Sequence, residues 1–142
     1  MTFNTITKSV NITQPGAVFA EGVSSPFIEL KNYKYIDFIV SSGTGTAAET
    51  TVTVKGKNGE DGTAKEVEFK INTNGTAFED KTSDILSIGG AEGNSGFKVY
   101  RISTDNLASN GFDRVNINLS AVADSTVTGC ITAVMYEPRY TE

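Results

Sequence analysis

The stretch Glu66-Val67-Glu68-Phe69-Lys70-Ile71 decides the fold class of this chain. Its apolar residues alternate strictly with charged ones. This period-two pattern is typical of a β-strand with one face in a core and the other in solvent. The same alternation predicts further strands within residues 35–40, 51–55, 97–99, 115–119 and 127–136. The chain is therefore expected to be all-β.

Turn residues separate these strands. Asn58-Gly59 and Asp61-Gly62 tolerate the positive φ of tight turns, so they predict a hairpin between a strand ending near Lys57 and one beginning near Glu66. No stretch of ten or more residues has a helical period, and Thr104-Asp105-Asn106-Leu107 makes at most one helical turn. We expect about seven to eight short antiparallel strands in a single β-sandwich, of jelly-roll or immunoglobulin-like type.

A chain of 142 residues and 15.1 kDa fits one domain. Residues 16–142 are expected to form the sandwich. Residues 1–15, rich in Thr and Asn, are expected to form a polar N-terminal arm that adds to a sheet edge or reaches a neighbour. The residues expected in the core are Phe27, Ile36, Phe38, Val40, Val52, Val54, Val67, Phe69, Ile71, Val99, Val115, Ile117 and Val134. The last strand, residues 127–136, is apolar on both sides and is expected to be central or covered by a partner.

The composition excludes several classes of function. Twelve Lys and Arg against 17 Asp and Glu give a net charge of −5, which disfavours nucleic acid and anionic membranes as partners. There is no histidine, so Ser–His and Cys–His catalysis and histidine metal sites are excluded. The single Cys130 allows no internal disulfide and is expected to be a packing group. No signal-like start and no apolar stretch of about 20 residues is present, so we expect a soluble intracellular chain.

The remaining candidate sites are weak. Glu66 and Glu68 could form a glycosidase acid–base pair, but a solvated charge ladder explains them better. The acidic residues of 60–62 and of 79–84 lack the spacing of a calcium loop. The glycine-rich stretch 89–96 lacks the Lys-Ser/Thr ending of a phosphate loop. We therefore predict a non-enzymatic protein with no catalytic, cofactor-binding or metal-binding residues.

Tyrosine and arginine are the more informative residues, because both are enriched at the centres of protein interfaces. Tyr33 and Tyr35 flank Lys34, and two further tyrosines flank Glu137-Pro138-Arg139. The alternative is that each tyrosine caps a sheet edge with its hydroxyl in water. The residues predicted to contact a partner are Phe3, Ile6, Val10, Ile12, Tyr136, Arg139 and Tyr140.

Four segments together carry a resemblance to a known group of proteins. They are Phe27-Ile28-Glu29-Leu30, Tyr35-Ile36-Asp37-Phe38-Ile39-Val40, Thr50-Thr51-Val52-Thr53-Val54 and Tyr136-Glu137-Pro138-Arg139-Tyr140, preceded by a short polar arm. In the order and character of these segments, the chain resembles the small all-β virion structural proteins of tailed bacteriophages and prophages. The resemblance is particularly to head decoration proteins, also called auxiliary capsid proteins.

This resemblance implies a mechanical function. The protein would be made in the host cytoplasm, act as a dimer or trimer, and stabilise the capsid by binding the major capsid protein, or other virion proteins, at the capsid surface through its terminal arms. No cofactor is implied. The alternatives are another virion component (tail tube, fibre or connector), a carbohydrate-binding β-sandwich module, and, remotely, a small hydrolase.

Removal of residues 1–15 tests the proposed role of the arm. We expect the truncated protein to lose capsid binding and to keep the circular dichroism of a β-sheet protein, because the arm is expected to lie outside the sandwich. Co-sedimentation with phage heads measures the binding. Unaltered binding by the truncated protein would contradict the role assigned to the arm.

Overall fold

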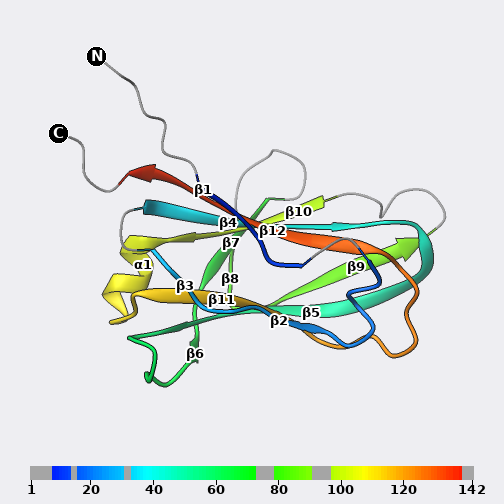
Figure 1. Ribbon diagram of the computed structural model, residues 1–142, viewed down its shortest axis with the longest axis horizontal. Coiled ribbons are helices and arrows are strands. Elements are labelled where there is room, and N and C mark those ends of the chain that lie inside the picture. Colours follow the sequence, from blue (N-terminus) through cyan, green and yellow to red (C-terminus); the bar gives the residue numbers. More distant parts are fainter. Residues whose placement is uncertain (1–7, 14–15, 31–32, 73–78, 91–96, 139–142) are drawn as a thin grey trace, which may run out of the picture.

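The computed structural model describes residues 8–13, 16–30, 33–72, 79–90 and 97–138. Two antiparallel β-sheets lie face to face and enclose one core, so the predicted all-β sandwich is confirmed (Figure 1). The described residues form twelve strands and one helix. The elements are β1 (Lys8–Asn11), β2 (Val23–Ser24), β3 (Ile28–Glu29), β4 (Tyr33–Ser42), β5 (Gly45–Lys57), β6 (Lys65–Glu66), β7 (Phe69–Asn72), β8 (Glu79–Lys81), β9 (Asp84–Gly90), β10 (Phe97–Ser103), α1 (Thr104–Ser109), β11 (Arg114–Leu119) and β12 (Gly129–Pro138).

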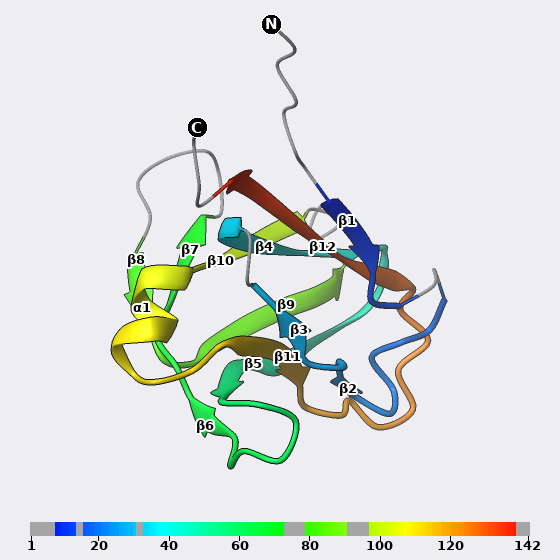
Figure 2. The ribbon, with the colours of Figure 1, turned by 60° about the vertical axis from the view of Figure 1, so that its left-hand side comes forward.

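The two sheets are called sheet A and sheet B. Sheet A has the strand order β1-β12-β4-β10-β7-β8. Sheet B has the order β2-β11-β5-β6, with β3 also paired to β11 and β9 also paired to β5. Figure 2 shows the two layers from the side of α1. The strand number exceeds the expected seven or eight because β1, β2, β3, β6 and β8 span only two to four residues each, too few to show an alternating pattern.

The stretch 66–71 is not one strand but a corner between the sheets. Glu66 ends β6 in sheet B, and Phe69 begins β7 in sheet A. The alternation nevertheless holds throughout, because Val67, Phe69 and Ile71 are buried while the charged residues between them are exposed. The core lies between the sheets, so a chain that crosses from one sheet to the other keeps the same residues pointing inward.

The hairpin predicted around Asn58-Gly59 is confirmed. β5 ends at Lys57 and pairs with β6 in the antiparallel direction. Gly59 has φ of +70°, a left-handed conformation that glycine adopts without the steric cost of a Cβ. The turn at the other end of β5 is different, because β4 lies in sheet A and β5 in sheet B, so these two long strands are not hairpin partners.

The core is larger than the sequence predicted. Ten of the expected core residues are buried, but Phe27, Val99 and Val134 are only half-buried. In β10 the side chains that fill the core are Tyr100 and Ile102, so the predicted inward phase of this strand was wrong. Buried residues that the pattern did not identify are Phe19, Leu30, Leu86, Ile88, Tyr100, Ile102, Leu107, Leu119, Val127, Ile131, Ala133 and Met135.

β12 lies between β1 and β4, so its predicted central position is confirmed. Ile131, Ala133 and Met135 face the core, and the opposite set faces outward. At the start of the strand, Gly129 packs against the carbonyl of Ser41 and the ring of Phe19, where a Cβ would collide with both. Only glycine fits this close approach.

The helix α1 closes one end of the sandwich (Figure 1). Ser103 is its N-cap, and the Ser103 hydroxyl accepts a hydrogen bond from the backbone N–H of Asn106. Thr104 donates its hydroxyl to backbone carbonyls of β4, at 2.9 Å for Lys34. Leu107 is buried beneath the helix. The expected helical turn is thus confirmed, and it is anchored to β4 and β10.

A polar contact joins the two sheets inside the sandwich. The carboxylate of Asp84, at the start of β9, accepts hydrogen bonds from Lys98 Nζ at 2.6 Å and from Tyr100 Oη at 2.9 Å, both on β10. Asp84 is 11% exposed and Lys98 17% exposed. Burial, followed by the charge of Asp84, raises the pKa of Tyr100. The three residues therefore act as a cross-sheet contact at a single carboxylate.

We expect Asp84→Ala to lower the free energy of unfolding by about 3 kcal/mol, because the mutation leaves the Lys98 ammonium and the Tyr100 hydroxyl without their shared acceptor in a mostly buried place. Urea titration monitored by circular dichroism measures this change. Asp61→Asn, in the exposed turn after β5, is the control and should stay within about 0.5 kcal/mol. A loss for Asp84→Ala no larger than that of the control would contradict the assignment.

Candidate functional site

The outer face of sheet A carries an apolar strip, formed by Ile39, Val99 and Val134. Ile39 on β4 is directly opposite Val99 on β10. Val134 on β12 is opposite Asp37, two residues from Ile39 on the same face of β4. All three apolar side chains are half-buried, although no other element of the described residues covers this face. A strip of β-branched side chains at the centre of a six-stranded sheet offers apolar area to a partner.

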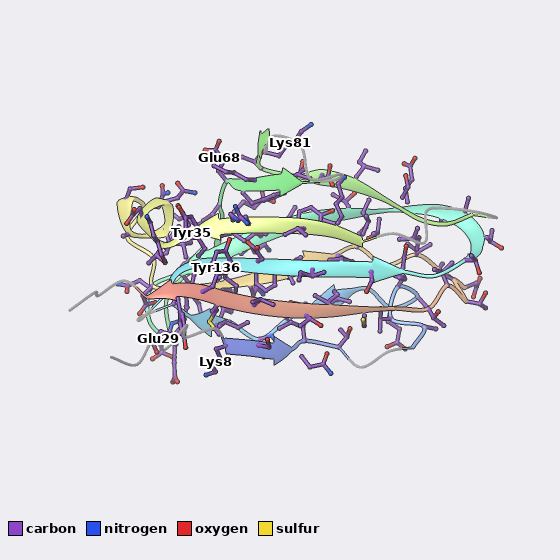
Figure 3. All side chains as sticks on the ribbon, turned by 90° about the horizontal axis from the view of Figure 1, so that it is seen from above. Lys8, Glu29, Tyr35, Glu68, Lys81 and Tyr136 are labelled. Carbon is purple, nitrogen blue, oxygen red and sulfur yellow. The ribbon has the colours of Figure 1, made fainter. Side chains whose placement is uncertain are left out.

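A second group, the Tyr–Arg cluster, adjoins this strip and consists of Tyr35, Asp37, Arg101 and Tyr136. The rings of Tyr35 and Tyr136 stack with centroids 5.5 Å apart. Figure 3, which looks onto sheet A, shows these two tyrosines side by side near the end of the sheet that α1 closes. Arg101 lies 5.6 Å from the Tyr35 ring centre and 5.5 Å from the Tyr136 ring centre. Such distances allow cation–π attraction to both rings.

Hydrogen bonds fix the Tyr–Arg cluster in place. Arg101 Nε donates to Asp37 Oδ1 at 2.9 Å, and Nη2 donates to Oδ2 at 3.2 Å, which makes a bidentate pair. The hydroxyl of Tyr136 donates to Asp37 Oδ1 at 3.3 Å. The hydrogen bond that Arg101 donates to Asp37 raises the pKa of Arg101. Partly exposed Tyr and Arg side chains that are already held in one conformation lose little entropy on binding.

A pocket of about 240 Å3 opens beside the cluster. It lies where β10, β7 and the start of α1 meet. Its lining residues are Tyr35, Glu68, Phe69, Lys70, Arg101, Ser103 and Asn106. Figure 3 shows Glu68 on the same side of the molecule as Tyr35, near α1. The pocket joins two aromatic residues, Tyr35 and Phe69, to several hydrogen-bonding groups.

The predicted contact residues have different positions. Tyr136 lies in the Tyr–Arg cluster. Val10 on β1 and Ile12 are half-buried and pack against the core of the same chain, which accounts for their apolar character. Four other predicted contact residues lie outside the described residues: Phe3, Ile6, Arg139 and Tyr140.

Sequence reasoning missed Asp37 and Arg101. Arg101 is separated from Asp37 by 64 positions, and Tyr136 is separated from it by 99. Only the pairing of β4 with β10 and β12 brings them together. One signal in the sequence could have identified them. Asp37 and Arg101 are charged residues within mainly apolar strands, and a charge in such a place requires a partner.

The acidic candidates do not converge. Glu66 and Glu68 are both exposed, and Glu66 ends β6 in sheet B while Glu68 lies in the corner that leads to β7 in sheet A. Among the residues that the structure describes, no group of three or more Cys, Asp or Glu side chains is arranged to hold a metal ion. Cys130 is half-buried on β12, with its sulfur 3.2 Å from the Ser41 hydroxyl.

The outer face of sheet B is polar where β2 and β11 pair, and on β9 it carries the exposed Ile85. Ser24 Oγ donates to Asn118 Oδ1 at 2.9 Å, and Asn118 Nδ2 donates to Asn116 Oδ1 at 3.1 Å. Asn116 Nδ2 then donates to the carbonyl of Ser25 at 3.0 Å. This chain of hydrogen bonds holds β2 against β11. The face contrasts with the apolar strip and Tyr–Arg cluster of sheet A.

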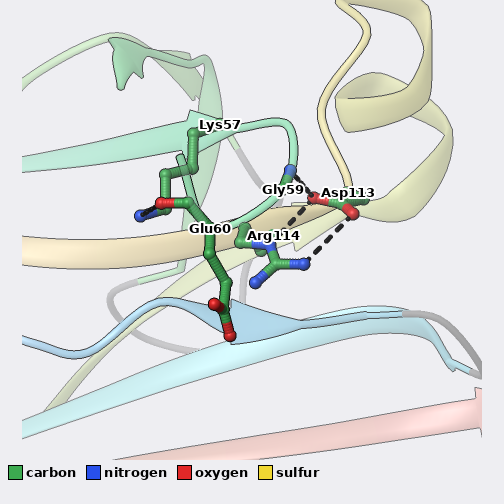
Figure 4. Close-up of polar contacts among 5 residues, drawn as sticks. All are labelled: Lys57, Gly59, Glu60, Asp113 and Arg114. Atoms are coloured by element: carbon green, nitrogen blue, oxygen red, sulfur yellow. Dashed lines mark hydrogen bonds and ion pairs between the residues drawn. The ribbon is translucent and has the colours of Figure 1, made fainter. Parts of the chain in front are cut away.

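A further polar cluster holds the turn after β5 (Figure 4). Asp113 Oδ1 accepts from the backbone N–H of Gly59 at 3.0 Å and from Arg114 Nε at 3.0 Å. Lys57 Nζ donates to the carbonyl of Glu60 at 2.8 Å. The hydrogen bond from Arg114 lowers the pKa of Asp113. These contacts secure a hairpin and lie at its exposed end, away from the Tyr–Arg cluster.

The comparisons with known proteins give a likeness of fold. No protein-family model matches the chain, and no curated protein sequence matches it. The structure is similar to the crystal structure of the SPBc2 prophage-derived protein YomS, with a TM-score of 0.60 and 9% sequence identity. The match covers 93% of this chain and 94% of that chain. At this identity the likeness establishes a shared fold over nearly the whole length.

No helix within the described ranges has both the length and the apolar character needed to cross a membrane.

The lowered pKa of Asp113 predicts a contribution to acid sensitivity. Its folded-state pKa lies below the ordinary value of 3.8, so the stabilisation is present above pH 3.8 and is lost as the pH falls through the folded-state value. Asp113→Asn should cost less than about 1 kcal/mol at pH 7, because the pair is on the surface. Its urea midpoint should fall less than that of the wild type between pH 4 and pH 2. Equal declines in the two proteins would contradict the prediction.

Proposed function

We propose that this protein is a non-enzymatic structural protein of a bacteriophage or prophage virion. Within that class we assign it to the head decoration type, which binds the major capsid protein at the outer capsid surface after synthesis in the host cytoplasm. The outer face of sheet A is the docking surface. The proposal depends on one observation: the apolar strip and the Tyr–Arg cluster lie next to each other on the outer face of sheet A.

This composition favours a protein partner. Tyrosine and arginine are enriched in the few interface residues that contribute most of the binding energy, and apolar side chains next to them exclude water from those contacts. The Asp37–Arg101 pair neutralises itself, so burying it requires no charge from the partner. The outer face of sheet A therefore offers a partner aromatic and apolar side chains that are already held in place. The ion pair Asp37–Arg101 on this face needs no further charge.

The ends of sheet A add to this surface. β1 begins at Lys8, which is opposite Met135, and β12 ends at Pro138. Lys8 and Pro138 therefore lie at the same end of sheet A as Tyr136. We infer that the terminal arms, which the sequence continues from these two residues, add to the contact with the partner. Many identical contacts over a capsid add up to strong attachment even when each is weak.

The likeness to a prophage-derived protein over almost the full length supports a phage origin for this chain. The same fold can serve other virion components, so a tail tube, fibre or connector position is the alternative within the class. We expect the protein to act as a dimer or trimer, with neighbouring copies adding to the contact with the capsid.

The β1 strand changes how the terminal arm should be tested. Removal of residues 1–15 deletes β1 and exposes the edge of β12, so it damages sheet A as well as the arm. Removal of residues 1–7 leaves β1 in place. This shorter truncation is therefore the cleaner form of the arm experiment.

The function is tested with the double substitution Ile39→Lys and Val134→Lys, which places two charges in the apolar strip. We expect wild-type protein to co-sediment with heads of the phage that carries its gene, at a fixed ratio per capsomer. We expect the double variant to bind at least tenfold more weakly, because docking would bury two unpaired ammonium groups. Mass-resolved sizing of the free protein gives the oligomeric state.

Ile85→Lys is the matched control, since Ile85 is an apolar residue that is 60% exposed on β9 in sheet B. It should bind heads as the wild type does. Circular dichroism of each variant verifies folding. Equal binding by the double variant and the control would overturn the docking face, and wild-type protein that binds isolated tails or no virion part would overturn the decoration assignment.

A further inference from the structure

The pocket beside the Tyr–Arg cluster combines hydrogen-bond donors and acceptors with the aromatic residues Tyr35 and Phe69. Glu68 supplies a carboxylate, while Lys70 and Arg101 supply cationic donors. Ser103 and Asn106, at the start of α1, contribute a hydroxyl and an amide. Tyr35 adds aromatic surface. These five polar residues come from the corner before β7, from β7 itself, from β10 and from α1, so the tertiary fold alone assembles them.

Three of the five polar side chains, those of Arg101, Ser103 and Asn106, are held in place by contacts of their own. Asn106 Nδ2 donates to the backbone carbonyl of Glu68 at 3.0 Å, which joins α1 to the corner before β7. The Ser103 hydroxyl accepts from the N–H of Asn106 at 3.1 Å. Arg101 is held by its bidentate pair with Asp37. A ligand would therefore meet side chains that are already oriented.

The charges indicate which class of ligand fits. Asp37 neutralises Arg101, and the carboxylate of Glu68 balances the ammonium of Lys70, so the pocket has no net charge to select an anion or a cation. A purely apolar ligand would leave this polar rim without partners. Hydroxyl groups both donate and accept hydrogen bonds, so a ring bearing several hydroxyls can satisfy a carboxylate and cationic donors together.

The size of the pocket agrees with a small ring. Its volume of about 240 Å3 is below the range of roughly 300 to 1,000 Å3 that is typical of drug-sized ligand sites. This volume suits one sugar ring at the end of a glycan. The weakly positive C–H groups of such a ring can pack on the negative face of an aromatic side chain, as Tyr35 could provide.

We propose that this pocket binds a neutral saccharide unit, with Tyr35 as the aromatic surface and with Glu68, Lys70, Ser103 and Asn106 as hydrogen-bonding partners. This site shares Tyr35 and Arg101 with the Tyr–Arg cluster but contains no residue of the apolar strip on β4, β10 and β12, so it adds a glycan-binding activity to the docking function that substitutions in the strip can separate from it. The two activities can fail independently.

Ligand-observed saturation-transfer NMR on the full chain tests the site, with glucose, galactose, mannose and N-acetylglucosamine as probes. We expect at least one of these sugars to bind, and we expect cyclohexanol, a ring of the same size with one hydroxyl, not to bind. Tyr35→Ala and Glu68→Gln should each weaken the binding at least tenfold. Glu68 is exposed, so its substitution should leave folding intact.

Thr53→Ala, on the polar outer face of sheet B, is the matched control and should bind the sugar as the wild type does. The strip variant Ile39→Lys should also keep sugar binding, which separates this proposal from the docking function. Absence of binding by all four sugars would overturn the proposal. Binding that survives both Tyr35→Ala and Glu68→Gln, or that extends equally to cyclohexanol, would overturn it as well.

Discussion

The apolar core between sheets A and B constrains every segment that passes from one sheet to the other. Such a segment must keep the same alternate side chains directed into the core in both sheets. The corner at Glu66 to Phe69 illustrates this constraint, since the strand changes sheet while the alternation of buried and exposed residues continues without a break. The contact of Asp84 with Lys98 and Tyr100 adds a polar link across the same core. Burial of the apolar side chains supplies most of the stabilisation, and the polar link fixes which strands face each other.

The core leaves the two outer faces free to differ. On sheet B the Ser and Asn side chains of β2 and β11 hydrogen-bond to one another, and Ile85 on β9 is a single exposed apolar side chain. Sheet A presents an apolar strip beside a stacked tyrosine pair, which leaves apolar area in contact with solvent. This asymmetry is the physical basis of the proposed docking to a virion partner. The pocket at β7, β10 and α1 lies on the same side of the molecule and is lined mainly by polar and charged side chains.

The proposed functions need rigidity rather than reactive groups. Arg101 and Tyr136 both bond to Asp37, so the cluster is ordered before any partner arrives. The Ser103 hydroxyl is likewise fixed by capping α1, and the Asn106 side chain by its hydrogen bond to the Glu68 carbonyl. Binding energy is then not spent on ordering side chains.

The sequence by itself determined the all-β class, the hairpin at Asn58-Gly59 and most of the core, because alternation and turn chemistry act over a few neighbouring residues. It could not determine the inward phase of β10, where Val99 and Tyr100 are both apolar enough to be buried. The tertiary structure alone decided that Tyr35, Asp37, Arg101 and Tyr136 meet, and that Glu68 and Asn106 line one pocket. Those contacts depend on which strands pair and in what register. Pairing is set by the packing of the whole core, which no local stretch of sequence encodes.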